Sequence, residues 1–186
     1  MAVFNPAVPS TFKEMKKKPD ATTKKGKIAI YWARRGVKGF LNMYPKYTWQ
    51  ETAVDRYADV DGLLGCASNG RNVIQCVLEV KARSKMTHEQ LFGEFEGRWL
   101  ISYDKLVRGY DIAFVLRSHF ICMLVMPKEK RGYLRKIAHY NPETGGLEWT
   151  ADFEVRKTET QKTCNGGTAF RENAFIDMYK AKQFDV

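Results

Sequence analysis

Cysteine and histidine are scarce in this sequence. Its 186 residues include four cysteines and three histidines, and no two cysteines form a C-x-x-C pair. Cys66, Cys76 and Cys122, but not Cys164, lie in apolar, strand-like runs, which favours buried free thiols in a reducing cytoplasm. No apolar run approaches the ~18 residues needed to span a bilayer. The N-terminus lacks the order of a signal peptide, since its basic cluster follows its apolar residues. We therefore expect a cytoplasmic protein with no membrane partner.

Acidic residues are scarce near the N-terminus. Residues 1–46 hold eleven Lys and Arg against two Asp and Glu, a net charge of +9, and the other 140 residues add only +1. A basic segment on a nearly neutral body is typical of an arm that binds a polyanion. Nucleic acid is favoured over a membrane because no strong apolar face accompanies the charge. A solvated tail that only aids solubility is the other interpretation. The arm residues expected to contact the DNA backbone are Lys16, Lys17, Lys18, Lys24 and Lys25.

The rest of the chain has the composition of one globular domain, with 44% hydrophobic and 28% charged residues. We assign residues 1–26 to the basic arm and residues 27–186 to the domain. Predicted helices cover residues 27–44 (interrupted by Gly36 and Gly39), 87–95, 104–117 and 168–182. Predicted strands cover residues 47–54, 56–65, 72–82, 99–102 and 119–127, with an edge strand within 141–149 that pairs with 151–157. This order predicts an α/β fold around a mixed sheet.

Two local signals refine this prediction. Asn69-Gly70 is a hairpin-turn dipeptide between the two central strands. Thr87 and Gln90 have the spacing of a capping box at the start of a helix. The tryptophans are expected in the core or over the sheet rather than as platforms for stacked bases, and they are Trp32, Trp49, Trp99 and Trp149.

The predicted hairpin carries three charged residues among Val, Leu and Ile. Residues two apart on a strand share a face, so Glu79 and Lys81 point the same way. Asp61 lies about as far before the turn as Glu79 lies after it, so strand pairing can bring the carboxylates together. Two carboxylates suit a hard cation such as Mg²⁺. The cation lowers the pKa of bound water, which Lys81 can orient. Phosphodiester hydrolysis needs these parts.

An isolated E-x-K tripeptide is a weak signal, and Glu14-Met-Lys16 shows that one occurs in the basic arm without such a context. The order Asp61-Gly-Leu, turn, apolar strand and Glu79-Val-Lys81 is much more specific. A cross-strand salt bridge on a solvated sheet face is the competing interpretation of the same residues.

At Asp61-Gly62-Leu63 and at Leu78-Glu79-Val80-Lys81-Ala82-Arg83, the sequence resembles the PD-(D/E)xK nuclease superfamily, and in particular its lambda-exonuclease-like and Holliday-junction-resolvase-like members. The resemblance covers roughly residues 27–127. It implies a restriction-endonuclease-like fold, in which helices flank a mixed central sheet. It also implies a DNA nuclease that uses Mg²⁺, with Mn²⁺ as a substitute. Asp61 and Glu79 would be metal ligands, Lys81 the catalytic lysine, and the Val80 carbonyl a further ligand.

Other site positions are less specific. Many members carry another glutamate on the first helix, which residues 27–44 lack, and Glu51 is the nearest candidate. Gln90 matches a glutamine that some members place after the lysine, or is only a cap residue. Asp59 is a candidate second ligand or a partner for Arg56. Three residues after the motif are candidate phosphate contacts: Arg83, Ser84 and Lys85. The alternative is that they form an ordinary polar loop.

The expected function is Mg²⁺-dependent hydrolysis of DNA phosphodiester bonds in bacterial or phage DNA repair, recombination or restriction. Endonuclease and exonuclease action both fit, and a homodimer is expected where two cuts need two sites. One alternative is a nucleic-acid-binding protein that keeps the fold but does not cut. Another is a structural protein whose basic arm docks on an acidic surface.

Overall fold

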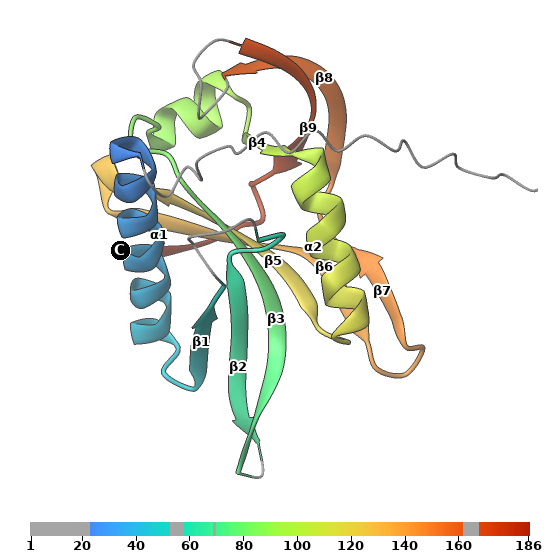
Figure 1. Ribbon diagram of the computed structural model, residues 1–186. Helices are drawn as coiled ribbons and strands as arrows, with labels where there is room; N and C mark the ends of the chain where they lie inside the picture. The colour runs from blue at the N-terminus through green and yellow to red at the C-terminus, as the bar shows by residue number, and fades with distance from the viewer. Residues whose placement is uncertain (1–22, 53–57, 69, 162–167) are drawn as a thin grey trace, which may run out of the picture.

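The computed structural model describes residues 23–52, 58–68, 70–161 and 168–186 (Figure 1). Its helices are α1 (Lys24–Met43), α2 (Tyr103–Val115), the π-helix η2 (Gln90–Glu94) and the short 3-10 helix η3 (Pro127–Glu129). Its strands are β1 (Tyr47–Glu51), β2 (Gly62–Ser68), β3 (Arg71–Ala82), β4 (Arg98–Ser102), β5 (His119–Met126), β6 (Arg131–Asn141), β7 (Gly146–Trp149), β8 (Phe153–Gln161), β9 (Thr168–Asp177) and β10 (Lys182–Asp185).

The strands form two sheets, and the larger one is mixed. Its strand order is β1-β2-β3-β5-β6-β10, with β7 paired to β6, and a smaller sheet has the order β4-β9-β8. Strand β3 is antiparallel to β2 and parallel to β5. The predicted α/β class with a mixed sheet is therefore confirmed. No helix in the described part of the chain is long and apolar enough to cross a membrane.

Helices α1 and α2 cover opposite faces of the large sheet (Figure 1). Residues of α1, including Phe40, pack with Leu78 and Val80 of β3. Residues of α2, including Leu106, pack in a second cluster with Val77. Because successive strand residues point to opposite faces, these alternating contacts place one helix on each side. The second cluster also contains residues of β4 and β9, so the small sheet shares the core on the α2 side.

Several predicted elements are confirmed at the level of hydrogen bonds. Strands β2 and β3 pair as a hairpin, and Gly70 in its turn has φ +73°. In the capping box, the Thr87 hydroxyl accepts from the Gln90 amide and the Gln90 side chain accepts from the Thr87 amide, each at 3.2 Å. The following helix is mostly a π-helix rather than an α-helix. The predicted strand at residues 56–65 is shorter in the structure: β2 begins at Gly62, residues 58–61 form no strand, and residues 56 and 57 lie outside the described part of the chain.

Helix α1 begins earlier than predicted and is not interrupted by its glycines. Its N-cap is Thr23, so Lys24 and Lys25 belong to the first helical turn and not to an extended arm. A Cβ at Gly36 would overlap Cγ2 of Val125, and the helix packs closely on the sheet there. Lys16, Lys17 and Lys18 lie outside the described residues.

The C-terminal prediction is wrong. Residues 168–182 were expected to form a helix, but most of them form β9, which pairs with β4 and β8. Helical propensity is a weak preference, and two neighbouring strands satisfy the backbone of β9 instead. The strand at 153–161 consequently pairs with β9, whereas β7 pairs with β6. No element was predicted for residues 128–140, which contain most of β6.

The described cysteines are free, as predicted. Cys76 and Cys122 are buried, and Cys66 is only half-buried. Burial raises the pKa of the Cys76 thiol to about 12. Burial, followed by the charges of Glu79 and Asp61, also raises the pKa of Cys122. Thiols with such raised pKa values are inert at neutral pH. Cys164 lies outside the described residues.

Candidate functional site

Glu79 is a fully buried carboxylate in the middle of the large sheet. Its Oε1 lies 3.1 Å from Nζ of Lys81, and its Oε2 lies 3.4 Å from Nζ of Lys105 in α2. Oε1 accepts no well-aligned hydrogen bond from the described residues, so its contact with Lys81 is an ion contact. Burial raises the pKa of Glu79, and the two ammonium groups only partly oppose this shift. A buried carboxylate with an unsatisfied oxygen is costly unless it has a function or a missing partner.

Asp61 lies directly before β2 and opposite Glu79. The register pairs Gly62 with Leu78, so the next residues outward on the two chains are Asp61 and Glu79. The Asp61 backbone amide donates to the Leu78 carbonyl at 3.1 Å. Its carboxylate Oδ2 accepts from the Val80 amide at 2.7 Å. The negative charge of Asp61 contributes to the raised pKa of Glu79. The structure therefore places Asp61 and Glu79, the two carboxylates predicted from the sequence to lie together, opposite each other.

The direction of the Val80 carbonyl follows from that of its amide. Both backbone polar groups of a strand residue point toward one neighbour in an antiparallel pair. The Val80 amide donates to Asp61. The Val80 carbonyl therefore points to the same edge of β3, toward the segment before β2 that contains Asp61.

These oxygens fit a hard divalent cation. Two carboxylates and a main-chain carbonyl are the donor types that Mg²⁺ prefers, and Mg²⁺ usually retains several water ligands. Oε1 of Glu79 has an ion contact with Lys81 but no well-aligned hydrogen bond, so it is the oxygen that supports such an ion. Across the described ranges, no group of three or more His, Cys, Asp or Glu could hold a metal. A bound ion would therefore depend on the carbonyl and on water as well as on the carboxylates.

Lys81 lies at the surface end of this cluster, with its side chain 35% exposed. Burial lowers the pKa of its ammonium group, but the charges of Glu79 and then Asp61 outweigh burial, and the net pKa is raised. Lys81 is thus a cation and a hydrogen-bond donor at neutral pH.

Sequence reasoning missed two residues of α2 that reach this region. Lys105 contacts Glu79 and also donates to the Ala58 carbonyl at 3.2 Å. Arg108 contacts Asp59 at 2.6 Å and Asp104 at 3.0 Å. No motif in the sequence connects α2 to β3, so only the packing of the helix on the sheet reveals these contacts.

Each of the three additional candidates has another partner in the structure. Asp59 is partly exposed and paired with Arg108, while its proposed partner Arg56 lies outside the described residues. Glu51 forms a bidentate contact with Arg34 of α1, at 2.8 and 2.7 Å. It therefore faces α1, on the other side of the sheet from Glu79. The Gln90 side chain is held in the capping box.

The candidate phosphate-binding residues gather at the end of β3 beside α1. Ser84, Lys24 and Lys25 line one pocket of about 370 Å³. Lys85 is exposed. Arg83 is half-buried, its amide donates to the Val125 carbonyl at 2.8 Å, and burial lowers the pKa of its guanidinium.

No protein-family model, curated protein or solved structure matched the chain when it was compared with each. The functional proposal therefore depends on the fold, residues and geometry of the chain itself.

Proposed function

We propose that this protein is a metal-dependent DNA nuclease with a restriction-endonuclease-like fold, from a bacterium or phage. The observation that carries the proposal is Glu79, a fully buried carboxylate beside Asp61 whose Oε1 has an ion contact with Lys81 but no well-aligned hydrogen bond. A charge is retained at such a place when it is paired or binds a metal. The mixed sheet, with α1 and α2 on opposite faces, supports the restriction-endonuclease-like fold.

The residues have separate roles in this proposal. Asp61, Glu79 and the Val80 carbonyl would hold Mg²⁺, or Mn²⁺ in its place, which lowers the pKa of bound water and stabilises charge on the phosphate. The Val80 amide fixes the Asp61 carboxylate, so that one of its oxygens is already positioned. Lys81 donates a hydrogen bond to the attacking water or to a phosphate oxygen, because its raised pKa keeps it protonated. Lys105 holds the second oxygen of Glu79.

The charge distribution supports a nucleic-acid substrate. The basic residues of α1 have no acidic counterpart within the helix, and they are Lys24, Lys25, Lys27, Arg34, Arg35 and Lys38. The start of this helix lies beside Ala82 and Ser84, at the end of the strand that carries Glu79 and Lys81. A cationic surface beside a carboxylate site attracts a polyanion and positions it without reading its sequence.

A second candidate is a nucleic-acid-binding protein that keeps the fold but does not cut. One observation favours it: Lys81 and Lys105 already neutralise Glu79. In this alternative the cluster is a structural ion-pair network, and the basic surface alone carries the function.

A cleavage assay distinguishes the two candidates. Purified protein is incubated with supercoiled plasmid, linear duplex or a four-way junction in Mg²⁺, Mn²⁺ or EDTA. We expect metal-dependent cutting that falls by about 10²–10³-fold in Lys81→Met, which removes one hydrogen-bond donor, with a loss at least as large in Asp61→Asn and Glu79→Gln. Asp104→Asn and Lys180→Met remove exposed charges of the same kinds and should cut normally. Salt-sensitive binding without any cutting would favour the binding protein, and cutting retained in Glu79→Gln would contradict the site.

A further inference from the structure

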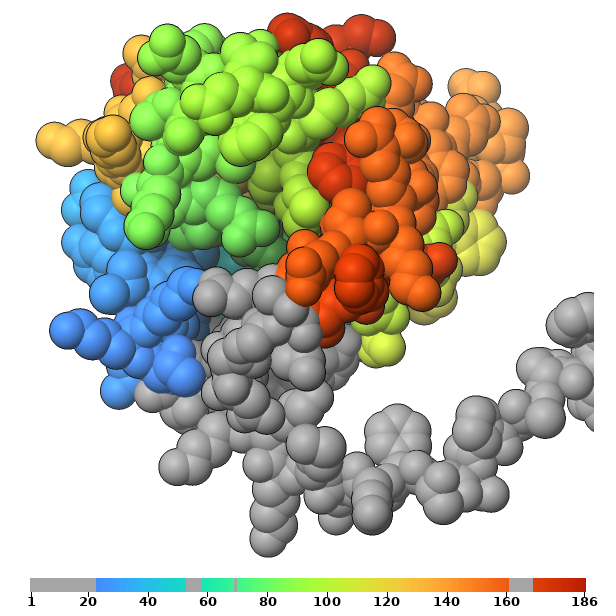
Figure 2. Space-filling model, turned by 90° about the horizontal axis from the view of Figure 1, so that it is seen from above, coloured from blue at the N-terminus to red at the C-terminus, as the bar shows by residue number. Residues whose placement is uncertain are grey.

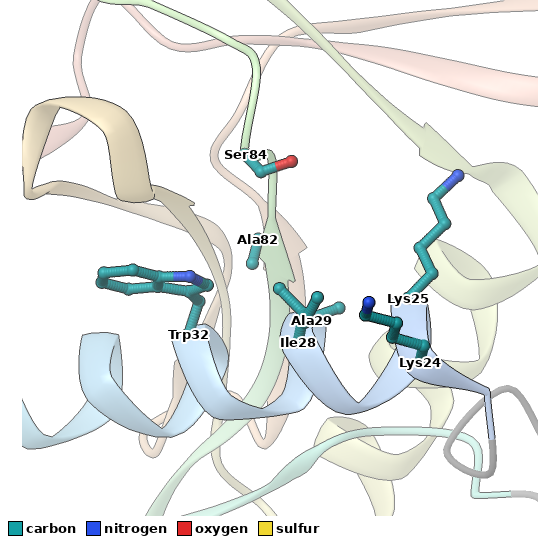
Figure 3. Close-up of a pocket in the computed structure, with 7 residues that line it drawn as sticks. All are labelled: Lys24, Lys25, Ile28, Ala29, Trp32, Ala82 and Ser84. Atoms are coloured by element: carbon teal, nitrogen blue, oxygen red, sulfur yellow. The ribbon is translucent and has the colours of Figure 1, made fainter.

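A pocket of about 370 Å³ lies between the first turns of α1 and the end of β3. This volume is within the usual range for ligand pockets, about 300–1,000 Å³. Its lining residues are Lys24, Lys25, Ile28, Ala29, Trp32, Ala82 and Ser84. Figure 3 shows the Trp32 indole at one end of the pocket, the Lys24 and Lys25 side chains at the other, and Ser84 above. The pocket is therefore aromatic at one end and cationic at the other.

The aromatic end presents an ordered, partly exposed ring. The Trp32 indole contacts the edge of Tyr31, with ring centroids 5.3 Å apart, and the Arg35 guanidinium lies 6.0 Å from its centroid. Neighbouring Ile28 is 47% exposed although it is apolar. Trp32 thus differs from Trp99, which is fully buried in the core. A held indole beside exposed apolar surface is suited to stacking against a flat ring.

The cationic end lacks a counter-ion within the part of the chain that the structure describes. Neither Lys24 nor Lys25 takes part in an ion pair there, and the first turn of α1 contains no acidic residue. The Ser84 hydroxyl adds a hydrogen-bond donor on the opposite wall. Two ammonium groups and a hydroxyl together are suited to a phosphate group.

The pocket lies at the same end of β3 as the candidate catalytic site, but on the other face of the sheet. Ala82 packs toward α1, whereas the preceding Lys81 contacts Glu79 on the face that α2 covers. Ser84 lies three residues after Lys81, so their Cα atoms are at most about 10 Å apart, the length of about three stacked nucleotides. Seen from above, the start of α1 (blue) and the segment after β3 (green) border the same end of the molecule (Figure 2). A DNA strand that passes over this end of the sheet, from the α1 face to the α2 face, reaches both places.

We propose that this pocket binds one nucleotide of the DNA strand, with its base stacked on Trp32 and a phosphate between Lys24, Lys25 and Ser84. The proposal rests on the proposed function, since it takes DNA as the substrate. It assigns to the first turns of α1 the task of holding the strand a few nucleotides from the carboxylate pair. The aromatic end binds any base, so the pocket fixes position without selecting sequence.

Equilibrium binding of a short fluorescein-labelled single-stranded oligonucleotide to the full chain in EDTA tests this proposal without cleavage. Trp32→Leu should weaken binding by about 5- to 150-fold, because loss of base stacking has effects of this size. Phe170→Leu, which removes an exposed aromatic ring of β9 outside the pocket lining, should bind within about two-fold of the wild type. Oligonucleotide should also quench a tryptophan signal that is absent in Trp32→Leu.

The lysines are tested by the salt dependence of the same binding. Lys24→Gln/Lys25→Gln should reduce the slope of log K against log salt by about 1.4, at about 0.7 for each single-strand phosphate contact. Lys27→Gln/Lys38→Gln removes the same charge from α1 outside the pocket, so it should reduce the slope less.

Three outcomes would overturn the proposal. The first is unchanged binding by a folded Trp32→Leu, shown by an unaltered melting temperature. The second is a control variant that loses as much oligonucleotide affinity or salt dependence as the pocket variant it is paired with. The third is competition by free deoxyadenosine monophosphate as strong as that by the oligonucleotide, which would assign the pocket to a free nucleotide. If the binding results are as expected but no cleavage is seen, the nuclease proposal fails and the nucleotide-binding pocket stands.

Discussion

Nζ of Lys105 in α2 lies 3.4 Å from Oε2 of Glu79 in β3, although the two residues are 26 positions apart in the sequence. This contact places the buried carboxylate between two ammonium groups, since Lys81 approaches the other oxygen. It also makes α2 part of the candidate site and not only a cover for the sheet. Removing Lys105 therefore leaves Lys81 as the one ammonium group of the described residues that contacts Glu79.

Lys105→Met should lower the free energy of unfolding by about 1–3 kcal/mol, because one oxygen of a buried carboxylate loses its partner. Lys81 remains and limits the loss. Glu79→Gln/Lys105→Met should cost less than the sum of the two single changes, because the glutamine has no charge to neutralise. Urea unfolding of the four proteins gives the coupling energy. The exposed Lys180→Met is the control, and additive effects would show that the contact does not stabilise the protein.

Divalent cations should raise the melting temperature of the wild type. At one hundred times the dissociation constant, a ligand of the folded state contributes about 2.7 kcal/mol, which for this length corresponds to a shift of about 5–11 °C. Asp61→Asn and Glu79→Gln should lose most of the shift produced by Mn²⁺. Asp59→Asn should retain it, because the Asp59 carboxylate is already paired with the Arg108 guanidinium at 2.6 Å. An equal shift in all variants would locate the ion elsewhere.

Asp61→Ala should leave the Val80 backbone amide of β3 without a hydrogen-bond acceptor. The Val80 amide donates to the Asp61 carboxylate, and alanine leaves this donor without an acceptor. We expect faster hydrogen exchange at the Val80 amide and a loss of about 1–3 kcal/mol in unfolding free energy. Asp61→Asn keeps an acceptor oxygen, so it should largely preserve protection while removing metal binding. Unchanged exchange in the alanine variant would contradict the hydrogen bond.

Gly36→Ala should destabilise the protein by about 1–3 kcal/mol, because the added methyl group would overlap Val125 at the contact between α1 and the sheet. Helical propensity alone predicts the opposite sign, a gain of about 1 kcal/mol. Gly93→Ala in η2 has no atom within 4 Å of the added Cβ and should be neutral or slightly stabilising. Thermal unfolding compares the two variants. Stabilisation by Gly36→Ala would mean that α1 does not pack as closely as the structure shows.

His119 should make stability depend on pH below its ordinary pKa of 6.5. Burial lowers the pKa of His119, with smaller contributions from Lys136 and His139, whose ring stacks on it. Its Nδ1 accepts from the Tyr140 amide at 3.1 Å and must be unprotonated to do so. The stabilisation is therefore present above pH 6.5 and is lost as pH falls through the lowered pKa.

His119→Gln should accordingly show a weaker loss of stability on acidification than the wild type. Urea unfolding at several pH values measures this difference, and NMR titration of the histidine ring checks the direction of the pKa shift. Parallel pH profiles for the two proteins would contradict the prediction.

The sequence alone determined the central hairpin and the pair of carboxylates. The period of two along β3 places Glu79 and Lys81 on one face, and the turn before it places Asp61 opposite Glu79. The capping box of Thr87 and Gln90 was also recognisable. These features follow from residues close together in the chain or joined by one short turn, where local periodicity and backbone geometry leave few alternatives.

Only the tertiary structure decided which residues distant in the sequence contact the carboxylate pair and which candidates point elsewhere. It made residues 168–177 a strand between β4 and β8, although their local propensity favoured a helix. It brought Lys105 to Glu79 and turned Glu51 toward Arg34 on the opposite face of the sheet. Such choices depend on which elements become neighbours when the chain collapses around its core. Local propensities are small compared with strand pairing and burial, so they do not specify those neighbours.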